Sequence, residues 1–150
     1  MKMEEILKTA ISTKPTKLVS AFPATGKSHY YENTSLDVLD SDSSKFDKTK
    51  FPQNYIEHIK NNLGKVDIIF ISSHKPVRDA LVNEGLEFTL IYPNIDLKDE
   101  YMERYKNRGN SQSFIDLLDT NWNNWIVELS NQEGCEKIEL QQGQYISDVL

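Results

Sequence analysis

The stretch Leu18-Val-Ser-Ala-Phe-Pro-Ala-Thr-Gly-Lys-Ser-His-Tyr-Tyr31 sets an apolar run against a turn and a Gly-Lys-Ser sequence. The apolar run can form a β-strand, and the residues after Gly26 can open a helix. The pattern is close to the phosphate-binding loop G-x-x-x-x-G-K-[ST], which joins a strand to a helix. Ala21 stands where this motif has its first glycine, and alanine fits there if its φ is negative. The stretch therefore predicts a phosphate-binding loop in an α/β domain.

Each residue type in this loop has a physical task. Gly26 lets the backbone turn so that successive N–H groups face an anion, and the helix that follows adds the positive end of its dipole. Lys27 can reach the outer phosphates, and the hydroxyl of Ser28 can ligate Mg²⁺. A turn that contains Gly-Lys-Ser by coincidence is the alternative interpretation. The expected ATP-binding residues are Ala24, Thr25, Gly26, Lys27, Ser28 and His29.

Length and charge limit the class of protein. The chain has 150 residues, the size of one ordinary domain, so we expect a single domain over 1–150. No apolar run approaches the roughly 18 residues that a membrane span needs, and Cys135 is the only cysteine, which favours a reducing cytoplasm. The net charge of −6 argues against broad binding to duplex DNA. It leaves room for a local pocket that binds a phosphorylated ligand.

The rest of the chain alternates between helix-like and strand-like segments. Gly64, Gly85 and Gly134 each follow a helix-like stretch and precede an apolar run, as a helix C-cap glycine does. This alternation predicts a three-layer αβα sandwich with a mostly parallel sheet of about five strands. The expected strands are 17–21, 36–39, 66–72, 87–92 and 135–140. The expected helices are 3–12, 27–33, 53–63, 75–84, 97–107 and 111–130.

The last of these helices has one apolar face. Its large apolar residues follow spacings of four, four, three and four, which are typical of a face buried against a core. We therefore expect both tryptophans to pack in the core and to take no part in binding. The residues of this face are Phe114, Leu118, Trp122, Trp125 and Leu129.

Two acids follow the second expected strand. In an open α/β sheet ligands lie at the carboxyl ends of the strands, so Asp40 and Asp42 are expected beside the loop. Carboxylates beside a polyphosphate would repel it unless they bind Mg²⁺ or an acceptor hydroxyl. Asp40 could hold Mg²⁺ through water, and Asp42 could orient or deprotonate the hydroxyl. An Asp-rich and Ser-rich capping turn is the alternative.

The third expected strand ends without an acid. Ser72 and Ser73 stand where a Walker-B acid would be expected, which argues against a motor or switch ATPase. Arg78 follows at a helix start and can reach an acceptor phosphate. His74 is a candidate substrate-binding residue, with a helix cap or a solvent-facing position as the alternatives.

The segments FPATGKS, LDSDSS, SSHKPVR and YMERYKNRG resemble P-loop kinases of the nucleoside-monophosphate-kinase and shikimate-kinase type, and most closely the small phage-encoded members. The resemblance spans about residues 17–110. It implies a P-loop NTPase fold, with Asp40 near Mg²⁺ and Asp42 at the acceptor hydroxyl. It also implies that Arg78 contacts the acceptor. Arg104 and Arg108 would be catalytic arginines on a short lid, about 97–112, and the protein would act in the cytoplasm, that of the host if phage-encoded.

The function expected from the sequence is ATP-dependent transfer of a phosphoryl group to a small acceptor, a nucleoside or nucleotide. The cofactors would be ATP and Mg²⁺, and the catalytic residues would be Lys27, Asp42, Arg104 and Arg108. Two alternatives stay open. One is a polynucleotide 5′-hydroxyl kinase, which needs a positive groove. The other is a nucleotide-binding regulator without turnover, and product formation from labelled ATP would separate the three.

Overall fold

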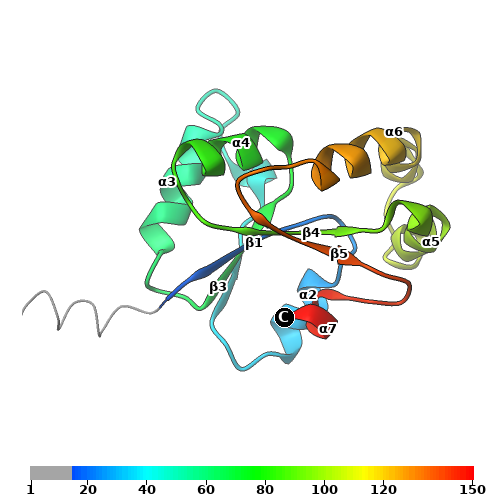
Figure 1. The fold of residues 1–150 in the computed structure, drawn as a ribbon, viewed down its shortest axis with the longest axis horizontal. Helices are drawn as coiled ribbons and strands as arrows, with labels where there is room; N and C mark the ends of the chain where they lie inside the picture. The colour runs from blue at the N-terminus through cyan, green and yellow to red at the C-terminus, as the bar shows by residue number, and fades with distance from the viewer. Residues whose placement is uncertain (1–14) are drawn as a thin grey trace, which may run out of the picture.

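The computed structural model describes residues 15–150, so the helix expected at 3–12 lies outside the described residues. In the described part, five strands form one sheet in the order β2-β3-β1-β4-β5, and every neighbouring pair is parallel. This confirms the expected parallel sheet of an α/β fold (Figure 1). The strands are β1 Lys17–Ala21, β2 Val38–Asp40, β3 Ile68–Ser72, β4 Thr89–Pro93 and β5 Glu136–Leu140.

Helices cover both faces of this sheet (Figure 1). The chain runs outward from β1 to the edge strand β2, then turns back to β3 and continues across β1 to β4. Because parallel crossovers are right-handed, this reversal puts α2 on the opposite face from α3 and α4. The helices are α2 Lys27–Asn33, α3 Gln53–Asn62, α4 Lys75–Asn83, α5 Lys98–Asn107, α6 Gln112–Ser130 and α7 Ile146–Val149, with short 3₁₀ turns at Ser43–Lys45 and Ile95–Leu97.

The core has two parts, one on each side of the sheet. The larger part lies under α3, α4, α5 and α6 and includes Tyr55, Tyr101 and Trp122, which are almost wholly buried. The smaller part lies under α2 and α7 and includes Val19 and Ile146. The expected core position of Trp122 is therefore confirmed. Trp125 is only partly buried: it packs against the core and also lines a cavity.

Element boundaries differ little from those expected. Gly64 and Gly85 adopt φ values of 82° and 68°, and each directly follows the C-cap residue of its helix, in the left-handed conformation that ends a helix. The expected helix end at Gly134 is wrong: α6 ends at Ser130 with Asn131 as its C-cap, and Gly134, with a φ of 80°, lies in the connection to β5. The second strand is displaced, to Val38–Asp40, so that it ends on the first acid of the pair. The four-residue helix α7 was not expected, because so short a segment has no measurable periodicity.

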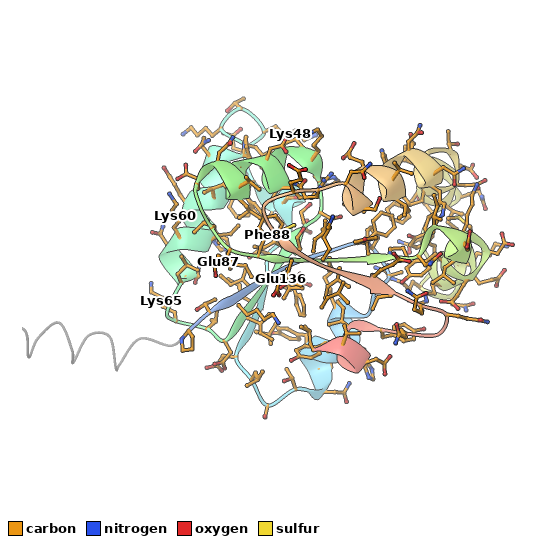
Figure 2. All side chains as sticks on the ribbon, viewed as in Figure 1. Lys48, Lys60, Lys65, Glu87, Phe88 and Glu136 are labelled. Carbon is orange, nitrogen blue, oxygen red and sulfur yellow. The ribbon has the colours of Figure 1, made fainter. Side chains whose placement is uncertain are left out.

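Charged side chains occupy the outer surface. Figure 2 shows Lys48, Lys60 and Lys65 on the outside of the molecule, where all three are exposed. Between residues 15 and 150 no helix has both the length and the apolar character needed to cross a membrane.

Candidate functional site

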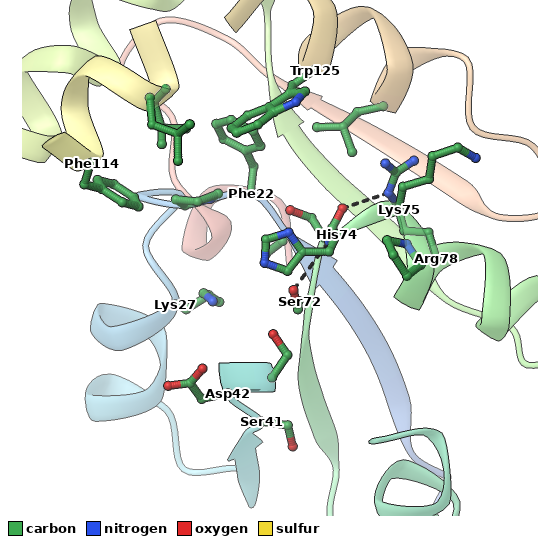
Figure 3. Close-up of a pocket in the computed structure, with 18 of the residues that line it drawn as sticks. Phe22, Lys27, Ser41, Asp42, Ser72, His74, Lys75, Arg78, Phe114 and Trp125 are labelled. Atoms are coloured by element: carbon green, nitrogen blue, oxygen red, sulfur yellow. Dashed lines mark hydrogen bonds between the residues drawn. The ribbon is translucent and has the colours of Figure 1, made fainter. Parts of the chain in front are cut away.

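The carboxyl ends of three strands meet at one edge of the sheet. Ala21 at the end of β1 lies opposite Ser72 at the end of β3, and Asp40 at the end of β2 lies opposite Phe70. The chain leaves β1 toward one face and β3 toward the other, and such a switch point opens a crevice between the strands. A cavity of about 810 Å³ lies here (Figure 3). Its position is the one at which open α/β sheets bind their ligands.

The loop after β1 contains two left-handed residues. Gly26 has a φ of 100°, and Ala24, with a φ of 67°, is the only non-glycine residue of positive φ in the described part of the chain. Ala21 therefore has a negative φ, which explains why alanine is accommodated where the motif has glycine. A positive φ at an alanine costs of order 1 kcal/mol, and surrounding contacts must hold it.

Those contacts involve the carbonyl groups of the loop. The Ala24 carbonyl accepts a bond from Arg104, and the Thr25 carbonyl accepts one from the Ile146 amide at 2.8 Å. The Phe22 carbonyl accepts the Thr25 hydroxyl at 2.7 Å. In contrast, within residues 15–150 the amides of Gly26, Lys27 and Ser28 donate no hydrogen bond. Unpaired amides that face one way form a concavity that binds anions.

A second cavity, of about 310 Å³, lies beside the loop and α5. Gly26, Ser28 and Tyr145 line it, and so do Lys27 and Arg108. Lys27 and Arg108 also line the larger cavity. These two cations therefore stand where the two cavities approach each other, which is the position a group must pass when it moves between them.

The other loop residues differ in their positions. Ala24 and the exposed His29 line the smaller cavity, and His29 also contacts Asn33. Thr25 is fully buried, and its side chain turns into the protein, where it holds the loop. The structure therefore brings five of the six expected loop residues to the smaller cavity and leaves Thr25 behind the loop.

Arg104 bonds both to the loop and to the C-terminal segment, and it lines the smaller cavity. Its side chain is only 9 % exposed, and its guanidinium donates to the Ala24 carbonyl at 2.9 Å and to the Gln144 carbonyl at 3.0 Å. It lies between two tyrosine rings, 4.3 Å from the centroid of Tyr101 and 4.0 Å from that of Tyr145. Both contacts are close enough for cation–π attraction. Arg104 therefore holds the loop through these contacts, and because it also lines the smaller cavity, its expected contact with the reacting group stays a prediction.

Two buried tyrosines limit the movement of the expected lid at 97–112. Tyr101 and Tyr105 of α5 are fully buried in the larger core, so this helix is anchored on both sides of Arg104. The continuous exposed part of the segment starts at Lys106 and ends at Gly109, which has a φ of 78°. A closing movement of the segment stays a prediction, and the buried tyrosines confine it to the end of α5 and the turn that follows.

Arg78 lines the larger cavity, but its donors are directed into the protein. Its side chain is 3 % exposed and forms an ion pair with Glu128. It also donates to the Ser73 carbonyl at 2.8 Å and to the Gln132 amide oxygen at 2.7 Å. The contact with an acceptor phosphate expected from the sequence therefore competes with acceptors that the protein itself supplies.

The acid pair is at the larger cavity, as expected. Asp40 and Asp42 are exposed residues that line it, and Ser41 between them is buried. Figure 3 shows Asp42 and Ser41 on the same side of the cavity as Lys27. His74 also lines the cavity, occupies the N-cap position of α4 and makes no side-chain capping bond.

Helix α3 fixes the backbone of the acid pair. The Ser41 hydroxyl lies 2.9 Å from Nε2 of His58, and the Ser41 carbonyl accepts the Tyr55 hydroxyl at 2.8 Å. The same tyrosine oxygen accepts the Ser72 amide of β3 at 3.2 Å. Burial raises the pKa of Tyr55 to about 12, and the carboxylates of Asp40 and Asp42 raise it as well, against a lowering by the Ser72 amide. Tyr55 therefore stays protonated at neutral pH and donates to Ser41.

Removing this hydroxyl should destabilise the protein. We expect Tyr55→Phe to lower the free energy of unfolding by about 1–3 kcal/mol, because the Ser41 carbonyl and the Ser72 amide lose their buried partner. Urea denaturation measures the change. Tyr31→Phe is the matched control, since Tyr31 is 53 % exposed and should change the stability by less than about 0.5 kcal/mol. Equal stability of the two variants would contradict a structural role for the Tyr55 hydroxyl.

Several residues of the site gave no signal in the sequence. Tyr145 packs on the loop from the C-terminal segment, where a Cβ on Gly26 would come within 3.0 Å of its ring. Tyr55 and His58 were visible only as residues of a helix. Their neighbours in space lie 14 and 17 positions away in the chain, beyond the reach of any local pattern.

The expected Mg²⁺ ligands do not form a metal cluster of their own. Among the described residues no group of three or more His, Cys, Asp or Glu side chains could hold a metal ion. Comparison of the chain with protein-family models and with curated protein sequences finds no match, so neither comparison assigns it to a family.

Proposed function

We propose that the protein is a P-loop kinase that transfers a phosphoryl group from ATP to a small acceptor. The observation that carries this proposal is the position of Lys27, which lines both the cavity beside the loop and the larger cavity beside the acid pair. A donor in the smaller cavity and an acceptor in the larger one would meet at this lysine. Catalysis would then consist mainly of positioning and of charge neutralisation.

The residues present fit a nucleoside triphosphate. In the described part of the protein the amides of Gly26, Lys27 and Ser28 donate no hydrogen bond, whereas carbonyls of the same loop already accept hydrogen bonds from the protein. The Ser28 hydroxyl is exposed in the smaller cavity, where it can ligate Mg²⁺. Bound Mg²⁺-ATP would supply an activated phosphoryl group.

The protein's own side chains have separate tasks in this proposal. Lys27 and Arg108 offset the negative charge that develops between the cavities. Asp42 accepts the proton of the attacking hydroxyl, and Asp40 orients the hydration shell of the metal. Arg104 and Tyr145 keep the loop in the shape that presents its amides. Phe22 and Trp125 exclude water from part of the larger cavity.

A transfer assay tests the proposal directly. The protein is incubated with ATP labelled in the γ-phosphate and with acceptors of several classes, and the labelled products are separated. We expect label in a phosphorylated acceptor, and ATP binding that is measurable by calorimetry. Release of inorganic phosphate without an acceptor product would indicate hydrolysis. Binding of ATP without any product would favour the regulator, and transfer only to an oligonucleotide would favour the polynucleotide 5′-hydroxyl kinase.

Substitutions of the two acids should change different kinetic parameters. We expect Asp42→Asn to lower kcat about tenfold at unchanged ATP affinity, because proton transfer contributes little to phosphoryl transfer that is largely dissociative. Asp40→Asn should instead raise the Mg²⁺ concentration needed for half-maximal rate. Steady-state kinetics with Mg²⁺ and ATP varied independently measure both effects. Wild-type kinetics in both variants would favour the alternative, in which the acid pair is only part of a capping turn.

A further inference from the structure

The larger cavity has two unlike walls. One wall carries the polar ends of the strands, and the other is formed by apolar side chains of α6 and the β1 loop. Figure 3 shows Phe22, Phe114 and Trp125 on the side of the cavity away from Asp42 and Ser41. Phe114 and Trp125 are partly buried, so part of each ring is open to the cavity. A wall of aromatic rings suits a ligand with a flat apolar face.

The charges on this cavity do not favour a second phosphate. Lys27 and Arg108 are shared with the smaller cavity, so the donor phosphates engage them first. The other ionic residues that line the cavity comprise two cations and three carboxylates. They are Lys75, Arg78, Asp40, Asp42 and Glu128.

Neither remaining cation is well placed to bind an acceptor phosphate. Arg78 is buried, forms an ion pair with Glu128 and donates to two further protein oxygens. Lys75 is 59 % exposed at the rim and pairs with Asp79 at 2.9 Å. A phosphate placed at Arg78 would have to approach the carboxylate of Glu128, and like charges in one pocket are unfavourable.

From these observations we infer that the acceptor is an uncharged hydroxyl compound with a planar ring, of the nucleoside class, and not a nucleotide. This inference rests on the proposed function and names the substrate class of the same site. The ring packs on the wall that contains Phe114 and Trp125, and the hydroxyl points toward Asp42. The hydroxyl oxygen bonds to the γ-phosphorus, the bond from that phosphorus to the β-phosphate oxygen breaks, and the proton passes to Asp42. The products are a phosphate monoester and ADP.

Matched acceptors test the inference. Each common nucleoside and its 5′-monophosphate are compared at equal concentration with labelled ATP, and a short oligonucleotide with a free 5′-hydroxyl is added to the panel. We expect kcat/KM for the best nucleoside to exceed that for its monophosphate by at least about tenfold. A monophosphate or the oligonucleotide that matches or exceeds the best nucleoside overturns the inference and leaves the kinase proposal intact.

A charge variant tests the physical reason. Glu128→Gln keeps a hydrogen-bond acceptor for Arg78 but removes the negative charge that offsets it. We expect the ratio of kcat/KM between nucleoside and monophosphate to fall at least about threefold, because the freed positive charge attracts the phosphate. Glu57→Gln is the matched control: Glu57 is exposed on α3, is not among the residues that line the cavity, and should leave the ratio unchanged. An unchanged ratio in Glu128→Gln contradicts the inference.

The aromatic wall that contains Phe114 and Trp125 can be tested separately. Trp125→Leu should raise KM for the best nucleoside at least about fivefold while changing the affinity for ATP by less than about twofold, because stacking on a base is lost only in the larger cavity. An unaltered KM contradicts the inferred position of the ring. Absence of transfer to every acceptor overturns the inference together with the kinase proposal, and calorimetry then shows whether the protein still binds ATP, as the regulator would.

Discussion

Lys27→Ala should lower the rate of phosphoryl transfer by about 30-fold to 1000-fold, equivalent to about 2–4 kcal/mol in the barrier. Lys27 is half-buried, stands at the first position of α2 and lines both cavities. Its removal would leave the developing charge on the transferred group without its nearest cation. The affinity for ATP should fall too, since the same ammonium group would contact the bound phosphates. Transfer assays and calorimetry measure the two effects.

The fold should tolerate this change, because alanine is a good helix former and Lys27 has no large buried contact to lose. Lys65→Ala is the matched control. It removes the same charge from an exposed position on the outside of the molecule and should leave both rate and affinity unchanged. A folded Lys27→Ala protein with wild-type ATP affinity and turnover would end the kinase proposal.

Arg104→Ala should give the largest loss of stability, about 3 kcal/mol in the free energy of unfolding. The change leaves the carbonyls of Ala24 and Gln144 without their donor and opens the space between two tyrosine rings. It also removes the ion-pair partner of Glu100, but Glu100 is 27 % exposed and still accepts a bond from the Gly143 amide at 3.1 Å, so the loss falls at the lower end of the range for buried pairs. Urea denaturation measures the change.

Arg108→Ala is the control on the same helix. Arg108 is exposed, so its removal should change the stability by less than about 0.5 kcal/mol while lowering turnover about tenfold. Arg104→Lys should recover only part of the lost stability, since an ammonium group cannot reproduce the planar fork that spans two carbonyls. If the urea midpoint of unfolding of Arg104→Ala equals that of the wild-type protein, Arg104 does not hold the loop.

Local signals predicted the elements around the site. The loop pattern and the glycine at position 26 placed β1 and α2 with the boundaries that the structure has. The glycines at 64 and 85 marked the ends of two helices, because each adopts a backbone conformation that other residues avoid. The predicted boundaries of strand 36–39 were the least accurate, because the observed strand, Val38–Asp40, has only three residues and so short a segment shows too little periodicity to fix a boundary.

The roles of the arginines could not be predicted in the same way. Arg104 and Arg108 lie four positions apart and have the same chemistry, yet one is buried and the other is exposed. Their difference comes from the partners that the fold supplies. Ala24 lies 80 positions from Arg104 in the chain, and Glu128 lies 50 positions from Arg78. Sequence spacing gives no information on contacts of such separation without the strand order.

The sequence by itself determined the class of fold, the loop with its lysine, and the two acids at the end of the second strand. These features depend on periodicity, on turn chemistry and on the geometry of neighbouring residues, which act within a few positions. Only the tertiary structure decided which cations are available to a ligand, which helix fixes the acid pair, and which side chain packs behind Gly26. The physical reason is that a buried charge is defined by what surrounds it. All four cations line the cavities, but Arg78 and Arg104 are buried and bonded to distant parts of the chain, whereas Lys27 is half-buried and Arg108 is exposed.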